Sequence, residues 1–174
     1  FDPVKKAFGP VSSTLDEDNV AWRLALDWTV KDGVLVFGSV SRGAKAGATP
    51  INAANISTQD APARQELLTA YELGIKAAML EHRVQANVSA FYYDYKDKQL
   101  SVYFADPIYT ALARLQNIPK SKAYGIDGDV TVRAGQDLTL IASATFLHTE
   151  VNGYTGINAA GQPQSFDGAE FLNS

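Results

Sequence analysis

The feature that most constrains this chain is a strict alternation of apolar and polar residues between Val20 and Val30. One parity holds only large apolar side chains and the other holds small or polar ones: Val20, Trp22, Leu24, Leu26, Trp28 and Val30 against Ala21, Arg23, Ala25, Asp27 and Thr29. Successive side chains of a β-strand point to opposite faces, whereas helical spacing would mix the two sets. The pattern therefore predicts a strand with one apolar face.

The dipeptide Asp32-Gly33 follows this strand and predicts a tight type I′ hairpin turn, because both central positions of that turn need positive φ. A second strand is expected from about Val34 to Arg42. Its register is open. A two-residue turn, which we favour, pairs Leu35 with Val30 and turns two residues to the apolar face, Leu35 and Phe37. A three-residue turn would instead place three valines on the apolar face, Val34, Val36 and Val40.

A second hairpin has a clearer register. Alternation runs through Tyr71–Met79 and again through Val84–Tyr92, and the four residues between them, Leu80 to Arg83, form the expected turn. That turn pairs Met79 with Val84. The same register keeps every apolar residue on one side, with the pairs Ala77–Ala86, Ile75–Val88 and Tyr71–Tyr92.

A third hairpin repeats this design. Its outward apolar residues run from Tyr124 to Val132 and from Leu138 to Phe146, with a short turn through Ala134-Gly135-Gln136. Six strands are therefore expected, joined alternately by short turns and long connections. The long connections are expected at Gly43–Arg64, at about Ala105–Lys120 and after Leu147.

Composition removes several function classes. The 174 residues contain no Cys, which excludes disulfides, zinc–thiolate sites and thiol catalysis. A net charge of −4 without a basic cluster argues against a nucleic-acid partner. No apolar run reaches the ~20 residues of a membrane helix, so any crossing is expected through strands. The chain starts at Phe1 without a leader, and we expect any targeting segment to lie upstream or to have been removed.

Two architectures fit such strands: a soluble β-sandwich that buries its apolar faces, and a transmembrane barrel that turns them to lipid. The strict alternation of short and long connections favours the barrel, whose tight turns all lie on the periplasmic side. Trp22 and Trp28 lie ~20 Å apart on one face, a spacing suited to the two bilayer interfaces. The opposite face carries charges, as a wet lumen would: Arg23, Asp27, Glu72, Lys76, Asp127, Asp129 and Arg133.

Four segments resemble, in order and spacing, strands of TonB-dependent outer-membrane receptors. Phe37–Gly47 is similar to the family's strand-to-loop signature, in which an aromatic residue, small residues and Ser precede Arg-Gly and Lys-x-Gly. Tyr71–Lys76 resembles the family's Tyr-Glu-x-Gly-x-Lys strand, and Phe91–Gln99 resembles the strand after it. Asn117–Ile126 is similar to the entry into the next strand. The resemblance covers about Val20–Asn173.

The resemblance implies that residues 1–174 supply about six strands of an all-β, antiparallel, up-and-down transmembrane barrel of roughly 22 strands. The plug domain, the segment that contacts TonB and the closing strand are expected outside these residues. The sequence departs from the family at Asp127 and Asp129, where the longer Glu is usual, and at Gly128, where an apolar residue is usual.

The implied function is TonB-dependent transport across the outer membrane of a Gram-negative bacterium, without enzymatic activity. The implied ligand is scarce, such as a ferric siderophore, haem, cobalamin or an oligosaccharide. Implied partners are outer-membrane lipid, the rest of the barrel, the plug, the TonB complex and the small-molecule ligand. Six residues of the expected long loops are candidate contacts for an anionic or aromatic ligand: Arg42, Lys45, Tyr103, Tyr109, Arg114 and Tyr154.

No catalytic, cofactor or metal site is expected. The histidines His82 and His148 fall at opposite ends of the strands, so they cannot share a metal or a triad. The acidic run at Asp16–Asp18 lacks calcium-loop spacing. Two alternatives stay open. A small self-contained outer-membrane barrel would need two more strands, at Phe1–Ser13 and Gln164–Asn173. A soluble β-sandwich binding domain would bury the Trp22 face in its own core.

Overall fold

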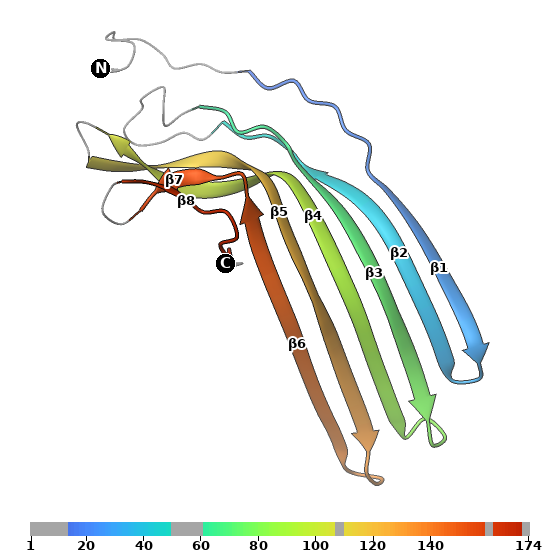
Figure 1. Cartoon of the computed structure of the whole chain (residues 1–174). Helices are drawn as coiled ribbons and strands as arrows, with labels where there is room; N and C mark the ends of the chain where they lie inside the picture. Colours follow the sequence, from blue (N-terminus) through green and yellow to red (C-terminus); the bar gives the residue numbers. More distant parts are fainter. Residues whose placement is uncertain (1–13, 50–60, 107–109, 159–161, 172–174) are drawn as a thin grey trace.

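The computed structural model of the chain describes residues 14–49, 61–106, 110–158 and 162–171 (Figure 1). Six strands form one antiparallel sheet in sequence order: β1 (Trp22–Lys31), β2 (Val34–Lys45), β3 (Glu66–Met79), β4 (Val84–Asp106), β5 (Thr110–Arg133) and β6 (Thr139–Asn152). Two short strands, β7 (Thr155–Ile157) and β8 (Pro163–Ser165), pair in a separate sheet. Within the described ranges, no helix is long and apolar enough to cross a membrane. The expectation of six antiparallel strands is confirmed.

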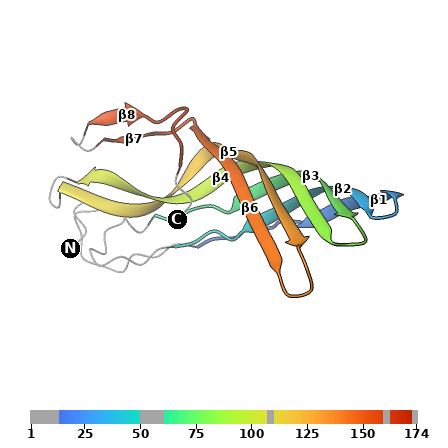
Figure 2. The same ribbon diagram turned by 90° about the horizontal axis from the view of Figure 1, so that it is seen from below.

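The large sheet is one curved layer without a second layer against it (Figures 1 and 2). Its large apolar side chains stay exposed: Leu26 is 74% accessible and Ile126 54%. The few buried hydrophobic residues of the described ranges gather beyond the end opposite the short turns, and they are Ala63, Ile118, Ala123, Val151 and Phe171. The apolar face of the sheet therefore has no core of its own, and the described residues do not form a sandwich.

The second hairpin has the expected register. Met79 pairs with Val84, and Leu80, Glu81 and His82 between them have φ values of 52°, 53° and 65°. The pairs Ala77–Ala86, Ile75–Val88 and Tyr71–Tyr92 are all present. In the third hairpin, Val132 pairs with Leu140, and the backbone N–H of Ala134 donates to the carbonyl of Leu138 at 2.9 Å.

The favoured register of the first hairpin is wrong. Asp32 and Gly33 do form the turn, and Lys31 pairs with Val34, but Val30 is bulged out of the ladder, so Leu35 pairs with Thr29. Only Gly33 has positive φ, at 75°, whereas a type I′ turn needs two such residues. Because of this extra residue, the side chains of β2 that were expected to face outward face inward, and the others face outward. The outward residues of β2 are therefore the alternate set, Val34, Val36 and Val40.

The structure also explains why the odd-numbered residues of β2, which include Phe37, face inward. Phe37 is the cross-strand partner of Gly74, and a Cβ built on Gly74 would lie 2.4 Å from Cζ of Phe37. The ring therefore covers the gap left by the missing side chain, and Lys76 Nζ lies 5.2 Å from its centroid. An outward register would lose this packing and would leave Gly74 uncovered.

Strands extend into each of the expected long connections, and they extend furthest into 105–120. β4 continues to Asp106 and β5 starts at Thr110, so the described parts of 105–120 belong to an extension of the β4–β5 hairpin. β2 extends into the expected connection 43–64 only as far as Lys45, and β3 begins after it, at Glu66. β6 runs past Leu147 to Asn152. Cross-strand hydrogen bonds can order polar, non-alternating segments, and periodicity does not detect such bonds.

The β4–β5 ladder is interrupted once, where Asp97 faces Pro119. The pairs Lys96–Lys120 and Lys98–Ile118 flank this position. Pro119 has no N–H, so it cannot donate to the carbonyl of Asp97, and Asn117 Nδ2 donates to that carbonyl instead at 2.7 Å. Asp97 has a φ of 55°. At Asp97 and Pro119 the hairpin side chains exchange faces. Between this position and the short turns, the even-numbered residues face outward. Beyond it, the even-numbered Ile118 packs with the inner residue Ala123.

Candidate functional site

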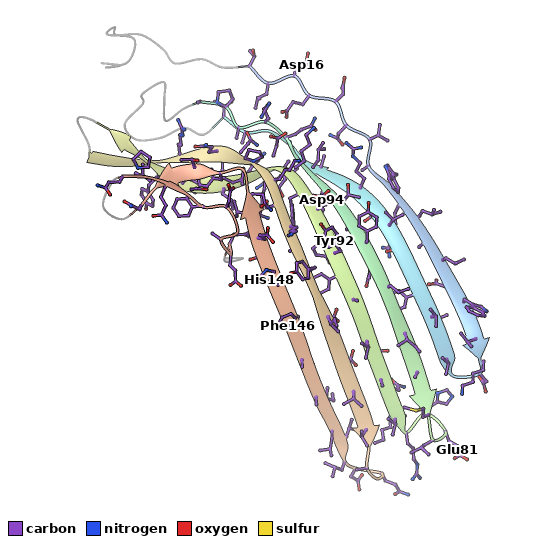
Figure 3. All side chains as sticks on the ribbon, in the orientation of Figure 1. Asp16, Glu81, Tyr92, Asp94, Phe146 and His148 are labelled. Atoms are coloured by element: carbon purple, nitrogen blue, oxygen red, sulfur yellow. The ribbon has the colours of Figure 1, made fainter. Side chains whose placement is uncertain are left out.

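The outward face of the sheet ends in a row of rings. Its members are consecutive cross-strand neighbours on β3, β4, β5 and β6: Tyr71, Tyr92, Tyr124 and His148. Figure 3 labels two of them, Tyr92 and His148. Their ring centroids are separated by 6.3, 6.3 and 5.1 Å. Below this aromatic row, β3 is apolar at each outward position down to Met79. That length fits the roughly 9–11 residues of a tilted membrane-crossing strand.

A charged row follows directly above the aromatic row. It holds the next outward residue of each strand from β2 to β6: Arg42, Thr69, Asp94, Lys122 and Glu150. Lys122 Nζ lies 2.8 Å from Glu150 Oε2. This hydrogen-bonded ion pair raises the pKa of Lys122 and lowers the pKa of Glu150. An apolar band that stops at rings and then at charges along one line is typical of the lipid-facing surface of a transmembrane barrel.

The inner face of the sheet is polar and hollowed. A concave pocket of about 520 Å³ lies over β1 to β5 and is lined by Arg23, Asp27, Glu72, Lys76, Asp127 and Asp129, among others. Ser89 Oγ donates to Asp127 Oδ1 at 2.8 Å, and Asn87 Nδ2 donates to Asp129 at 3.0 and 3.1 Å. The two aspartates are thereby held in fixed orientations, and their remaining lone pairs are free to accept further hydrogen bonds from the lumen side.

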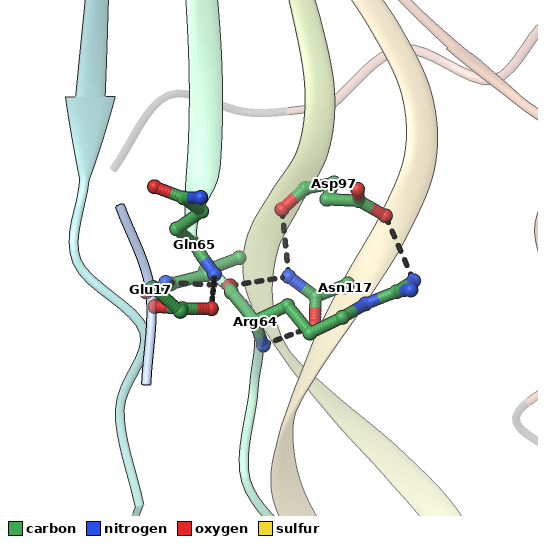
Figure 4. Close-up of polar contacts among 6 residues, drawn as sticks. Glu17, Arg64, Gln65, Asp97 and Asn117 are labelled. Atoms are coloured by element: carbon green, nitrogen blue, oxygen red, sulfur yellow. Dashed lines mark hydrogen bonds and ion pairs between the residues drawn. The ribbon is translucent and has the colours of Figure 1, made fainter. Parts of the chain in front are cut away.

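Polar side chains join the connections at the end opposite the short turns (Figure 4). Asn117 is central: it accepts from the backbone N–H of Arg64 at 2.8 Å and donates to the carbonyls of Arg64 and Asp97 at 2.8 and 2.7 Å. Glu17 accepts from the backbone N–H groups of Gly47 and Gln65 at 2.9 and 2.6 Å. This network, the Asn117 latch, fixes the base of the β4–β5 extension against the β2–β3 connection and the segment before β1.

A small core lies on the inner side above the charged row. Ile118 is fully buried there together with Phe171, whose N–H and carbonyl bond to Thr149 Oγ1 at 3.0 and 2.9 Å. Lys98 Nζ lies 3.8 Å from the ring centroid of Tyr95 and 4.7 Å from that of Phe171. Burial lowers the pKa of Lys98, and burial raises the pKa of Tyr95. We call this group the cation–aromatic cluster.

The structure brings two of the six ligand-contact candidates together. Arg114 on β5 lies close enough to Tyr154 to affect it: burial raises the pKa of the Tyr154 hydroxyl, and the Arg114 guanidinium partly offsets this. Tyr154 also packs on Phe166, with ring centroids 5.8 Å apart, and Arg114 Nη2 donates to Gln116 Oε1 at 2.8 Å. The Tyr154 side chain also packs against the buried residues of the cation–aromatic cluster, which include Ile118 and Phe171.

The other four candidates lie apart from this pair. Lys45, at the end of β2, faces inward and is the cross-strand neighbour of Glu66. Arg42 belongs to the outward charged row. Tyr103 is 67% exposed on the β4–β5 extension. Tyr109 lies outside the described residues.

The sequence did not single out Lys98, Tyr95 or Phe171. Lys98 stands in a run of alternating Lys and Asp that reads as an exposed strand edge, and Phe171 lies in the Gly- and Asn-rich C-terminal stretch. The one available signal was Pro119 in the middle of a strand, which marks a break in the ladder.

The two histidines lie on different elements and do not meet. His82 lies in the turn after β3, whereas His148 lies in the aromatic row, where its Nδ1 is 3.2 Å from Glu170 Oε1. Within the described ranges, no group of three or more His, Asp or Glu side chains could hold a metal ion.

The chain matches the family model described as "TonB dependent receptor-like, beta-barrel" over residues 2–172. Three solved receptors have the same fold in this region. A mutant of the ferric enterobactin receptor of Pseudomonas aeruginosa, in complex with enterobactin, aligns with a TM-score of 0.55 and 20% identity over 74% of this chain and 22% of its own. The alcaligin outer-membrane receptor of Bordetella pertussis aligns with a TM-score of 0.54 and 18% identity over 87% of this chain and 24% of its own. A siderophore receptor of Acinetobacter baumannii aligns with a TM-score of 0.54 and 19% identity over 79% of this chain and 24% of its own.

The chain therefore spans about a quarter of the length of these receptors. A comparison with curated protein sequences gave no match. The family consists of transport proteins and not of enzymes. The outward apolar band, the charged inner face and the match over residues 2–172 agree, and the chain belongs to the β-barrel family of TonB-dependent receptors.

Proposed function

We propose that the chain supplies about six strands of the barrel of a TonB-dependent transporter in the outer membrane of a Gram-negative bacterium. The observation that carries this proposal is the outward face, where exposed apolar residues end at the aromatic row and then at the charged row. A soluble protein rarely leaves so large an apolar surface uncovered, whereas lipid covers it in a membrane. The rest of the barrel would pair with the free edges of β1 and β6.

The charged inner face is proposed to contact a plug domain. Asp127 and Asp129 are held by Ser89 and Asn87 and point into the pocket of the inner face. Oriented carboxylates of this kind accept hydrogen bonds from Arg or Lys without the cost of ordering their own side chains. The shorter Asp in place of the usual Glu moves the contact closer to the barrel wall, so a longer cation, such as Arg, would reach it best.

Among the four ligand classes, we propose a ferric siderophore. Its support comes from the three structural relatives, which are named as receptors of ferric enterobactin, of alcaligin and of a siderophore. The chain adds a chemical argument: Lys98, Arg114 and Tyr154 place cations and rings at one end of the inner face, and anionic or aromatic iron chelates favour such surroundings. Lys45 and Tyr103 are proposed as contacts at the margin of the same region.

Uptake by whole cells tests this proposal. The complete receptor is expressed in a TonB-competent host that lacks its own siderophore receptors, and uptake is measured with radioactive iron as siderophore complexes, with haem and with labelled cobalamin. TonB-dependent siderophore uptake that falls severalfold in Arg114→Gln, with surface expression unchanged, is expected. Uptake of haem or cobalamin alone would contradict the ligand class, and uptake without TonB would contradict the transporter class.

Labelling tests the proposed orientation. Single labels at outward positions such as Trp22, Leu24, Leu26, Ile75, Val88 and Leu140 are expected to be accessible to lipid-soluble oxygen and shielded from a water-soluble quencher. Tags in 43–64, 105–120 and 148–168 are expected to be accessible on intact cells. Exposure of a tag at Leu80–Arg83 instead would invert the proposed topology.

A further inference from the structure

Two lysines oppose each other on the outward face without a partner of opposite charge. Lys96 on β4 and Lys120 on β5 are direct cross-strand neighbours, one outward position beyond the charged row, and both are exposed. No described carboxylate forms an ion pair with either of them, whereas Lys122 in the row below is neutralised by Glu150 at 2.8 Å. Like charges directly opposite each other on neighbouring strands repel. The pair would be relieved by an anion bound between its two ammonium groups.

The neighbours of this pair do not supply that anion. The other cross-strand neighbour of Lys96 is Leu67 on β3, and the other neighbour of Lys120 is Asn152 on β6; both are uncharged. Asp94, the outward acid two residues before Lys96 on the same strand, forms no ion pair with either lysine. The whole chain carries a net charge of −4, so two unpaired cations at one place on this face are not a consequence of a basic composition.

The height of the pair on the barrel identifies the anion. Lys96 lies four residues beyond Tyr92, or ~13 Å along the strand, and less along the membrane normal because barrel strands tilt by ~35–45°. Rings of the aromatic row mark the headgroup level. Lysine side chains are long and flexible enough to bend back toward that level while their stems cover apolar surface. Both ammonium groups can therefore reach the phosphates of the outer leaflet.

We propose that Lys96 and Lys120 form a binding site for the phosphate of an anionic lipid headgroup, with the lipid chains lying along the outward residues of β4 and β5. The outward surface below the pair suits such chains, because Tyr92, Tyr124 and Ile126 are exposed there. Two ammonium groups provide up to six N–H donors for the phosphate oxygens. The site goes beyond ligand transport, and it rests on the membrane orientation proposed above.

A local lipid measurement on the complete receptor tests this site. The chain has no Cys, so Leu67→Cys, the cross-strand neighbour of Lys96, gives this segment a single label position. The label is an environment-sensitive fluorophore, and the receptor is reconstituted in nanodiscs of phosphatidylcholine that contain either brominated phosphatidylglycerol or brominated phosphatidylcholine. The ratio of quenching by the two brominated lipids measures the local enrichment of the anionic lipid. We expect about fivefold enrichment for each lysine.

Matched variants separate the outcomes. Enrichment should disappear in Lys96→Gln/Lys120→Gln, return in Lys96→Arg/Lys120→Arg, and stay unchanged in Arg23→Gln/Lys76→Gln, which removes the same charge from the inner face. Equal enrichment in the Gln variant would overturn the site. A saturable response to inorganic phosphate in purely neutral nanodiscs, lost in the Gln variant, would assign the pair to free phosphate and overturn the lipid assignment. Absence of quenching by both lipids would overturn the membrane orientation itself.

Discussion

The two ends of this sheet are stabilised by different means. Toward the short turns, β1 to β6 form a regular ladder whose outward apolar side chains are exposed, and the sheet has no buried core there. Beyond the charged row, Ile118 and Phe171 are buried, and Asn117, Gln99 and Glu17 make several hydrogen bonds to the backbone of other segments. In the proposed orientation lipid covers the end with the short turns, the lower end, whereas the opposite, upper end has buried residues and hydrogen bonds of its own. Five predictions test this contrast.

The largest effect is expected for the polypeptide Phe1–Ser174 in water. Its outward apolar face would be uncovered, and the free edges of β1 and β6 would expose unpaired backbone groups. We expect aggregation in buffer without detergent. Analytical ultracentrifugation measures it, and a monodisperse monomer that unfolds in one transition would mean that the apolar residues pack against each other in water.

Charge substitution on the two faces separates lipid contact from simple exposure. Leu26 on the outward face and Ile141 on the inner face are both 74% exposed. An arginine in the centre of the apolar band costs about 2–4 kcal/mol of membrane stability, whereas a lumen position tolerates it. We expect Leu26→Arg to lower the free energy of unfolding by that amount in urea titrations of the complete receptor in vesicles, and Ile141→Arg to change it little. Equal losses would contradict the assignment of the faces.

Glycines on the two faces sharpen the same contrast. A Cβ on Gly125, on the inner face, would lie 2.0 Å from the carbonyl oxygen of Phe146 and 2.8 Å from the ring of Phe91. Gly125→Ala is expected to cost about 1–3 kcal/mol, because the backbone of β6 would have to move. Gly38→Ala is the control: its Cβ would meet only ordinary contacts at 3.6 Å on the outward face. The same urea titrations measure both, and tolerance of Gly125→Ala would contradict the close approach.

Loss of the Asn117 latch is expected to loosen only the upper end. Asn117→Ala removes three hydrogen bonds to the backbone of Arg64 and Asp97 and is expected to cost about 1–2 kcal/mol. Hydrogen exchange should become faster in the β4–β5 extension and stay unchanged near Met79 and Val84. Asn87→Ala, which removes bonds to Asp129 on the inner face, is the control. Faster exchange along the whole sheet would contradict a separate upper unit.

The smallest effect is expected from the exposed pair Lys122–Glu150. The pair lowers the pKa of Glu150, so its contribution is present above the ordinary value of 4.5 and is lost as the pH falls below it. It raises the pKa of Lys122, so the contribution is present below 10.5 and is lost as the pH rises above that value. As the pH falls, the rate of backbone hydrogen exchange at Lys122 should increase more in the unsubstituted receptor than in Glu150→Gln, which lacks the ion pair. Identical acid profiles of the two proteins would mean that the pair contributes nothing.

The local sequence determined the six strands and the register of the second hairpin. Period-two alternation located six strands, and between Met79 and Val84 the turn length agreed with the apolar pattern, so only one register kept the apolar residues together. The resemblance to TonB-dependent receptors, which rests on residues of the same strands, is confirmed by the family match over residues 2–172.

Only the tertiary structure decided the first hairpin and the site at the upper end. The face of Phe37 depends on Gly74, a residue of another hairpin, and no pattern within β1 and β2 contains that packing. The β4–β5 extension depends on cross-strand hydrogen bonds and on Asn117, which replaces the donor that Pro119 lacks. Lys98, Tyr95 and Phe171 meet because the facing changes at Asp97. Alternation records which side chains share a face of one strand, whereas these contacts join residues far apart in the sequence, and their partners are fixed only when the sheet has formed.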